Sequence, residues 1–276
     1  MDNKFVDLHV HSYYSDGTMS PLEIVEKAKE YNLKFIAIAD HDVTKGSLEL
    51  LKLLHNTDIH YISAVEIDTV HDNKNFHVLA YGIDLENLEF NKYVNEIHCT
   101  MDDYSVELIG NMENDFSELK LGEYNNFTHN SRMGGWKTLQ YLLHKGIINN
   151  LKEGIKFYGK YTKGLPKYPT IADVCEKIKY FHGYSVLAHP GELIDQNDKK
   201  SFEIELVKIL SMGIDGIECY YPTHSKEISE LCVKICKERN LIITSGSDCH
   251  GTFGKTRVGE MDITIEQLNI EKLIKK

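Results

Sequence analysis

The residues of this chain that could do chemistry are histidines and carboxylates placed at the ends of short apolar runs. The first run, Phe5–Val10, alternates so that Asp7, His9 and His11 share one face, because successive side chains of a strand point to opposite faces. Two imidazoles about 7 Å apart along one face can converge on a single metal ion. A lone His-x-His is as often a chance pair on an edge strand, so the rest of the chain decides between these interpretations.

Further imidazoles and carboxylates accompany the later apolar runs. Beyond the first pair, the set consists of Asp16, His41, Glu66, His77, His189, Asp248 and His250. Most of them stand where a run ends, whereas His77 lies nearer the beginning of its run. In barrels of parallel strands, functional groups gather at the carboxyl ends of the strands.

Acids and imidazoles that meet at such a place would be costly to bury unless cations compensate them. Neutral imidazoles with carboxylates and no thiolate suit Zn, Mn or Fe better than Ca or a structural zinc site. Because nine candidate ligands are too many for one ion, we expect two or three divalent ions.

The elements that must position these groups alternate between strand and helix. Short runs rich in β-branched residues predict strands at Phe5–Val10, Phe35–Ala39, Tyr61–Val65, Val78–Ile83, Ser185–Ala188, Gly216–Cys219 and Ile242–Thr244. Amphipathic helical patterns are predicted at 21–32, 44–56, 171–182, 201–213 and 225–240. Ser20, Pro21 and Glu23 form a capping signature at the first helix. This alternation predicts an α/β fold, and about seven strands favour a closed or nearly closed barrel of largely parallel strands over an open sheet.

The alternation fails between Leu85 and Pro169. This stretch is polar and helical at first, then rich in Gly and Lys, and it is too long for a barrel loop. We therefore expect one barrel domain over residues 1–276, with a mainly helical subdomain inserted at 85–169 that covers one face of the site.

Composition limits the function classes. The chain has 276 residues, with 31 Lys and Arg against 42 Asp and Glu, a net charge of −11 that disfavours nonspecific binding to duplex nucleic acid. No apolar run approaches the roughly 18 residues of a membrane span, and the N-terminus has no signal-peptide pattern. Six cysteines without a C-x-x-C pair are expected to be reduced thiols. These features predict a cytoplasmic protein with no membrane partner.

Several motifs together resemble the PHP superfamily, the polymerase and histidinol phosphatase domain. They are DLHVHSYYSDG, IADHD, the Glu66 and His77 pair, LAHPG, GIECYYPTHS and GSDCHG. They span nearly the whole chain in family order and are most similar to the bacterial branch that acts on nucleotides, such as 3′,5′-bisphosphates, and on the 5′ ends of oligonucleotides. The resemblance implies a distorted (β/α)7 barrel, similar to a TIM barrel, with a trinuclear metal centre.

The resemblance also implies a role for each ligand position. His9, His11, Glu66 and Asp248 resemble the ligands of one ion. Glu66 resembles a bridge to a second ion, which His77 and His189 also hold. Asp16, His41 and His250 resemble the ligands of a third. Asp7, Asp40 and Asp42 are left outside this set, either as carboxylates that orient imidazoles or as ordinary strand-end groups.

Phosphate recognition is expected from Arg132 and His224. Arginine suits phosphate through its planar fork, and Arg132 stands in a segment that resembles the family's inserted-domain stretch. The family pattern has a histidine two residues after that arginine, whereas this chain has Gly134. This difference argues against the phosphate pocket that is usual in the family. His224 resembles a position at the rim of the active site, where it could touch phosphate or protonate a leaving group.

The leading hypothesis is hydrolysis of a phosphomonoester by a hydroxide that bridges two metals. The expected substrate is a nucleotide or a 3′,5′-bisphosphonucleoside, with the 5′ ends of short RNA as a further candidate. Histidinol phosphate phosphatase is the close alternative, and an amidohydrolase-type hydrolase is a wider one. A non-catalytic, metal-stabilised binding domain is the alternative from another class.

Overall fold

The computed structural model describes residues 5–55 and 57–274. Its strands are β1 (Phe5–Val10), β2 (Leu33–Ile38), β3 (His60–Tyr61), β4 (Ala64–His71), β5 (Lys74–Tyr81), β6 (Tyr184–Leu187), β7 (Gly216–Tyr220) and β8 (Ile242–Ser245). Its helices are α1 (Pro21–Glu30), α2 (Lys45–Leu54), α3 (Leu88–Met112), α4 (Leu121–Asn126), α5 (Lys137–His144), α6 (Ile155–Tyr161), α7 (Ile171–Tyr180), α8 (Lys199–Leu210), α9 (Lys226–Arg239) and α10 (Glu271–Ile274). Single 3-10 turns are η1 (Ser131–Met133), η2 (Leu151–Gly154), η3 (Pro190–Glu192) and η4 (Ile265–Gln267).

The strands form two sheets that face one another around the site. One sheet has the order β1-β2-β3 and the other β4-β5-β6-β7-β8. Isolated bridges join the sheets at both edges, Val10 to Cys249 and His41 to Glu66. The described strands therefore surround a centre, as the predicted barrel requires, but they do not close into one continuous barrel.

The predicted parallel order breaks at one hairpin. β4 runs on to His71 and turns back into β5 through Asp72 and Asn73, both with positive φ, so β4 pairs antiparallel with β5, and β5 with β6. Two consecutive left-handed residues make the tight turn that favours a hairpin over a helical crossover. The predicted strand Tyr61–Val65 was wrong in its bounds, because His60–Tyr61 forms β3 in one sheet and Ala64–His71 forms β4 in the other.

Local signals for the helices are confirmed where they were clearest. Ser20 and Glu23 form a capping box at α1, and Pro21 takes the first helical position. Ile24, Val25 and Ala28 are buried against the sheets, although Leu22 points outward. Among the described residues, no helix is long and apolar enough to span a membrane.

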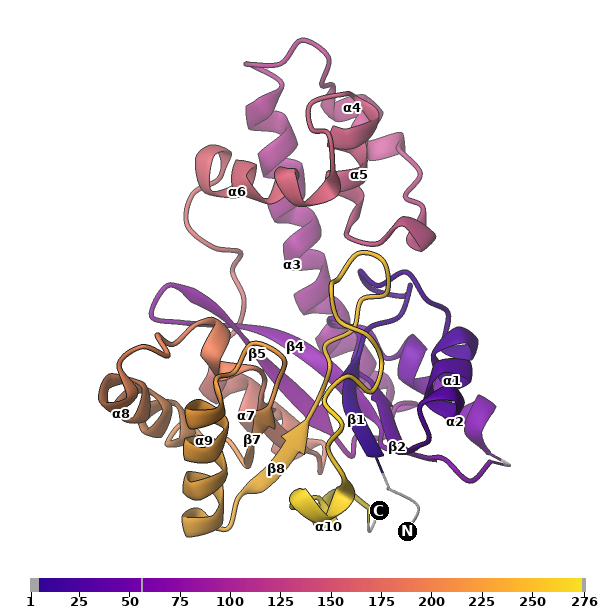
Figure 1. The fold of residues 1–276 in the computed structure, drawn as a ribbon. Helices are drawn as coiled ribbons and strands as arrows, with labels where there is room; N and C mark the ends of the chain where they lie inside the picture. Colours follow the sequence, from indigo (N-terminus) through magenta and orange to yellow (C-terminus); the bar gives the residue numbers. More distant parts are fainter. Residues whose placement is uncertain (1–4, 56, 275–276) are drawn as a thin grey trace.

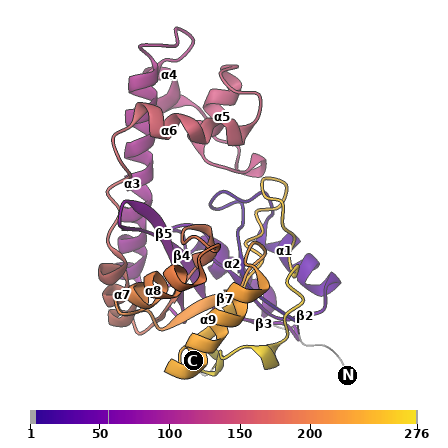
Figure 2. The same cartoon turned by 60° about the vertical axis from the view of Figure 1, so that its left-hand side comes forward.

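The segment between β5 and α7 stands apart from the sheets as a helical lobe (Figures 1 and 2). Its longest helix, α3, packs Phe90, Val94 and Ile97 into the core around the second sheet. Farther along, Leu108 and Met112 of the same helix enter a separate core with α4, α5 and α6. A single helix thus carries the lobe over the ends of the strands, where the loops after β1 and β8 rise toward it (Figure 1).

Candidate metal centre

Strand β1 delivers two buried imidazoles to the same point, as the alternation predicted. Nε2 of His9 and Nε2 of His11 are 3.0 Å apart, and each lies 3.1 Å from Oε2 of Glu66. Both side chains are fully buried. Oδ1 of Asp248 lies 3.1 Å from Nε2 of His11, so two nitrogens and two carboxylate oxygens face one another.

Glu66 is the group that the imidazoles share. Its other oxygen, Oε1, lies 3.0 Å from Nδ1 of His77 and 3.0 Å from Nε2 of His189. Glu66 and His77 lie inside the antiparallel strands β4 and β5. The sequence had predicted that Glu66 stands at the end of a strand, and this was wrong. The hairpin brings them together from neighbouring strands, which explains why the early position of His77 in its run is no obstacle.

A third group lies beside the first two. Oδ2 of Asp16 is 3.2 Å from Nε2 of His250, and the rings of His11 and His250 stack with centroids 4.0 Å apart. His41 joins this group, and its Nε2 also lies 3.4 Å from Glu66. All nine predicted ligands thus meet in one continuous cluster.

The chemistry of this cluster fits divalent cations. Three sets offer ligand atoms that lie within 4.8 Å of one another: His9, His11, Glu66 and Asp248; His11, Asp16, His41 and His250; and His41, Glu66 and His77. Within the described residues, the buried Oδ1 of Asp248, Nδ1 of His41 and Nδ1 of His189 have no hydrogen-bond partner. Nitrogen and oxygen donors without thiolate are the ligands of Zn, Mn or Fe sites, so the donor set fits the predicted ions.

The carboxylates of the cluster are held in their charged form. Burial raises the pKa of Glu66, but the positive charge of the surrounding imidazoles in their protonated form outweighs this effect and keeps that pKa well below its ordinary value. Burial also raises the pKa of Asp248, and His9 and His250 reverse this effect, so the pKa is again well below the usual range. The centre therefore presents anionic oxygens at neutral pH, as a cation site requires.

Groups around the cluster fix the ligands in place. Glu218 accepts a hydrogen bond from Nδ1 of His9 at 3.1 Å and another from the backbone N–H of His189 at 2.9 Å. The hydroxyl of Tyr221 donates to Oδ2 of Asp248 at 2.9 Å. Such partners set the tautomer and orientation of ligands. Asp7 and Asp40 instead accept bonds from loop groups near Ser247 and Ser12, so they shape the loops that carry ligands.

Asp68 was not among the site residues predicted from the sequence. It lies two residues after Glu66 on the same face of β4, and its Oδ1 is 3.1 Å from Nε2 of His77. The spacing is the same signal that identified His9 and His11, and it would have found Asp68 had β4 been extended beyond Val65.

Arg132 and His224 have partners of their own in this structure. The Arg132 guanidinium forms two 2.6 Å bonds to the carboxylate of Glu23 on α1, and with the Ser20 N–H it lowers the pKa of Glu23 to about 2. Nε2 of His224 accepts from the N–H of Gly191 at 3.0 Å, and Nδ1 lies 3.2 Å from the carbonyl oxygen of Cys219. Their contacts with phosphate stay predictions.

Gly134 has no room for the histidine that the family resemblance led us to expect at this position. Its φ is +73°, and a Cβ would lie 2.4 Å from Cβ of Phe253, whose loop follows His250. Thr18 closes the other side at 2.9 Å. The absence of a side chain at Gly134 therefore allows a close contact between the lobe and the loop after β8.

Gly134→His should accordingly destabilise the protein by about 2–5 kcal/mol, from left-handed strain and overpacking together. Gly146→His is the matched control, because Gly146 has φ +69° but open space around it, so it carries only the backbone cost. Thermal unfolding of both variants measures the difference. Equal melting temperatures would contradict the packing argument.

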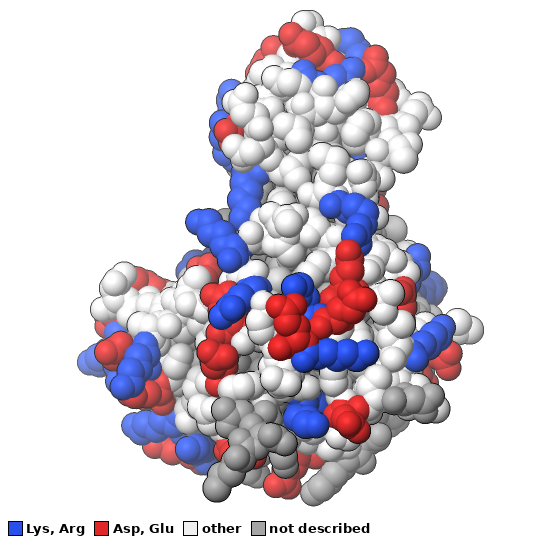
Figure 3. All heavy atoms as spheres, turned by 45° about the vertical axis from the view of Figure 1, so that its right-hand side comes forward, with Lys and Arg blue, Asp and Glu red and all other residues white. Residues whose placement is uncertain are grey.

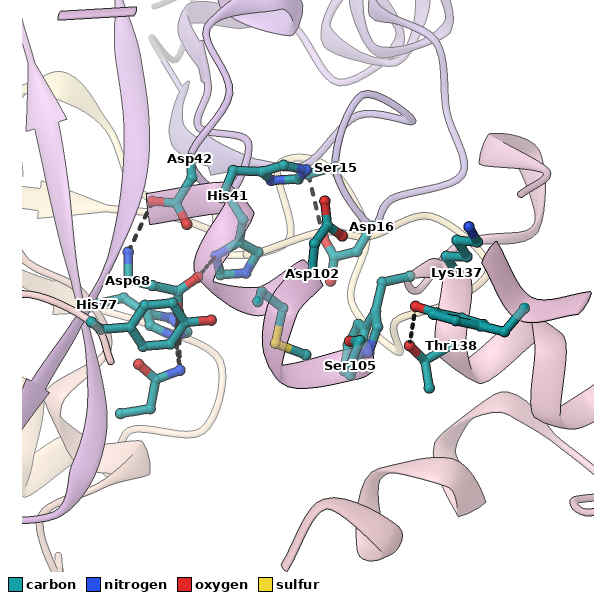
Figure 4. A pocket seen from close by; sticks show the side chains of 16 residues that line it. Ser15, Asp16, His41, Asp42, Asp68, His77, Asp102, Ser105, Lys137 and Thr138 are labelled. Atoms are coloured by element: carbon teal, nitrogen blue, oxygen red, sulfur yellow. Dashed lines mark hydrogen bonds and ion pairs between the residues drawn. The ribbon is translucent and has the colours of Figure 1, made fainter. Parts of the chain in front are cut away.

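A cavity of about 240 Å³ separates the cluster from the lobe. It is lined by Asp16, His41 and His77 of the cluster, by Trp136 of the lobe and by Tyr168, which packs with the core of the second sheet. Figure 4 shows His41, Asp68 and His77 on one side and Ser105, Lys137 and Thr138 on the other. The candidate ligands thus open directly onto a partly aromatic pocket.

Known proteins share this fold or resemble this sequence. Residues 7–219 match the PHP domain family. A 5′-3′ exoribonuclease of Haemophilus influenzae is 25% identical, over 93% of this chain and 94% of its own. A 3′,5′-nucleoside bisphosphate phosphatase of Chromobacterium violaceum is 23% identical, over 89% and 87%. A solved structure from Bifidobacterium adolescentis, described as a metal-dependent phosphoesterase, superposes with a TM-score of 0.79 at 21% identity, covering 98% of this chain and 95% of that one.

The fold and the matched relatives define a class first: the hydrolases that act on phosphoester bonds. More specifically, the match over residues 7–219 shows that the chain belongs to the PHP domain family. The resemblance inferred from the motifs is confirmed.

Proposed function

We propose that this protein is a metal-dependent phosphoesterase that removes a phosphate from a nucleotide, with a 3′,5′-bisphosphonucleoside as the expected substrate. The observation that carries the proposal is Glu66, whose two oxygens lie within 3.4 Å of His9, His11, His41, His77 and His189. One buried carboxylate among five imidazoles suits a centre with more than one cation.

The proposed ligands are the nine predicted residues, in the three sets that the resemblance implied. When bound, the ions would polarise phosphoryl oxygens and lower the pKa of water. The chain's own residues orient the ligands: Glu218 holds His9, and Tyr221 holds Asp248. His224 ties the loop after β7 to the turn after His189, which supports a role in positioning that turn.

The cavity supports a substrate whose released alcohol carries an aromatic base. Trp136, Tyr168 and Met101 give it flat or deformable apolar walls, while Asp16 and His41 connect it to the cluster. A nucleoside whose phosphate lies at the cluster would put its base among these side chains. Base stacking on aromatic rings is worth about 1–3 kcal/mol.

Trp136→Ala should therefore lower kcat/KM for a 3′,5′-bisphosphonucleoside about tenfold or more, while kcat/KM for glycerol phosphate stays unchanged, since glycerol offers no ring to stack. Trp136→Phe keeps a ring and should retain most of the activity. Equal losses with both substrates would count against a base in this cavity.

Arg132 is proposed to bind phosphate after exchanging its partner. Its guanidinium is half exposed, and its pair with Glu23 is a surface ion pair of little value to stability. A phosphate that replaces Glu23 would gain charge-assisted bonds worth about 1.5–3 kcal/mol.

Arg132→Ala should lower kcat/KM by about 10–100-fold. Glu23→Gln frees the guanidinium and should leave kcat/KM equal or higher. Arg239→Ala, an exposed arginine at the end of α9, is the control and should have no effect. If Arg132→Ala turns over substrate like the unmodified protein, Arg132 does not contact phosphate.

Charge on the surface favours small substrates. Acidic and basic side chains are interspersed on the face drawn in Figure 3, and the net charge is −11. Long nucleic acids need a basic track that pairs with many phosphates. A nucleotide or the 5′ end of a short RNA needs contacts only at the centre.

A substrate panel tests the proposal. The metal-free protein is reloaded with Mn or Zn and assayed with a chromogenic phosphomonoester, a 3′,5′-bisphosphonucleoside, a 5′-phosphorylated trinucleotide and histidinol phosphate. We expect the highest kcat/KM with the bisphosphonucleoside. Background activity with every ester would refute the phosphoesterase, and a preference for histidinol phosphate would favour the alternative.

A further inference from the structure

Asp68 lies directly behind one candidate ligand and close to a second. It is buried on β4, opposite His77 in the register of the β4–β5 hairpin. Its Oδ1 lies 3.1 Å from Nε2 of His77, and its Oδ2 lies 3.8 Å from Nδ1 of His41. In both imidazoles the other ring nitrogen faces Glu66, at 3.0 and 3.4 Å.

A cation beside Glu66 would select one tautomer of His77, whose Nε2 lies 3.1 Å from Oδ1 of Asp68 and 3.2 Å from the side-chain amide nitrogen of Asn75. A ring nitrogen can bind a cation only when it carries no proton. If Nδ1 of His77 faces a cation beside Glu66, the proton must sit on Nε2, and Asp68 is the carboxylate that accepts its hydrogen bond. For His41 the 3.8 Å separation is too long for a hydrogen bond, so the role of Asp68 is argued from His77 alone.

Neighbouring groups hold Asp68 in this position. Its backbone N–H donates to Oδ1 of Asp42 at 3.2 Å, and its Oδ1 accepts from the amide of Asn75 at 2.9 Å. Asp42 is itself fixed, because its N–H donates to the carbonyl oxygen of Glu66 at 2.9 Å. The carboxylate is thus built into the hairpin, and Figure 4 shows it on the wall of the cavity between Asp42 and His77.

Asp68 is not placed as a direct ligand. Its Oδ1 faces Nε2 of His77, whereas the other ring nitrogen, Nδ1, faces Glu66, so the His77 ring stands between Asp68 and the shared carboxylate.

We propose that Asp68 is a positioning residue of the metal centre, which fixes the tautomer of His77 so that this imidazole presents a free nitrogen beside Glu66. The inference rests on the metal centre of the proposed function, but not on the substrate. Carboxylates in this role typically contribute 10–100-fold to metal affinity.

The test is a titration of the metal-free protein with Zn in competition with a chromogenic chelator. Asp68→Ala should bind as many ions at saturation as the unmodified protein, with the affinity of one site weakened about 10–100-fold. Asp68→Asn keeps the shape and an acceptor oxygen, so its loss should be smaller. Asp84→Asn is the matched control, because it removes one charge from an exposed residue shortly after β5 whose Oδ1 accepts only from the N–H of Glu86 among the described contacts, and it should bind like the unmodified protein.

A second readout concerns the tautomer itself. In the zinc-loaded protein, nitrogen NMR of His77 should show the proton on Nε2, and Asp68→Ala should weaken or lose that signal. Unchanged affinity in both Asp68 variants would overturn the proposal. Loss of one ion at saturation in Asp68→Asn would overturn it too, because Asp68 would then be a ligand. A failure of turnover with normal zinc binding would refute only the phosphoesterase, whereas no zinc binding by the unmodified protein would refute both.

Discussion

Glu66→Gln should reduce kcat by about three orders of magnitude and lower the number of ions bound. Both oxygens of Glu66 are surrounded by imidazoles at 3.0–3.4 Å, so the carboxylate belongs to more than one ligand set. Glutamine keeps the shape but removes the charge. Charge stabilisation by metal ions is worth several kcal/mol, and about 4 kcal/mol corresponds to roughly 10³ in rate.

Steady-state kinetics and metal analysis of the purified variant measure both effects. Glu30→Gln makes the same chemical change on the exposed face of α1, where Glu30 pairs only with Lys27 among the described residues, and it should leave kcat unchanged. A Glu66→Gln protein with the full set of ions and normal turnover would show that Glu66 is a structural carboxylate.

Removal of the metals should abolish turnover and lower the melting temperature. An ion that binds only the folded chain stabilises it by about 2.7 kcal/mol at a hundred times its dissociation constant. For a chain of this size each kcal/mol shifts the melting temperature by roughly 2–4 °C, so each site accounts for about 5–10 °C. The carboxylates that such ions would compensate include Glu66 and Asp248, each of which has an oxygen 3.1 Å from Nε2 of His11.

Calorimetry of the chelated protein and of the protein reloaded with Mn or Zn measures this shift, and reloading should restore turnover. His9→Ala is the control, because a centre that lacks this buried ligand should gain less from the same reloading. Equal melting temperatures with and without ions, together with unchanged turnover, would contradict a metal-dependent enzyme.

The sequence predicts the parts of the site that depend on local spacing. Alternation along β1 is enough to place His9 and His11 on one face, and both nitrogens meet as expected. The capping box of Ser20 and Glu23 is also local, and α1 begins there. The family resemblance added the grouping of distant ligands, which spacing alone could not supply.

Other features depend on contacts between distant segments. The antiparallel hairpin at Asp72 places Glu66 beside His77, and no strand–helix alternation predicts it. Arg132 meets Glu23 across 109 positions, and Gly134 meets Phe253 across a similar span. Such pairs depend on how the lobe packs against the loops, so patterns within one segment of the sequence cannot predict them.

Anomalous scattering from crystals grown with manganese or zinc tests the central claim most directly. The account predicts two or three peaks within the cluster, with Glu66 next to more than one of them and His9, His11 and Asp248 around the first. Crystals with ample metal that show no peak there, and these side chains turned away from one another, would contradict it.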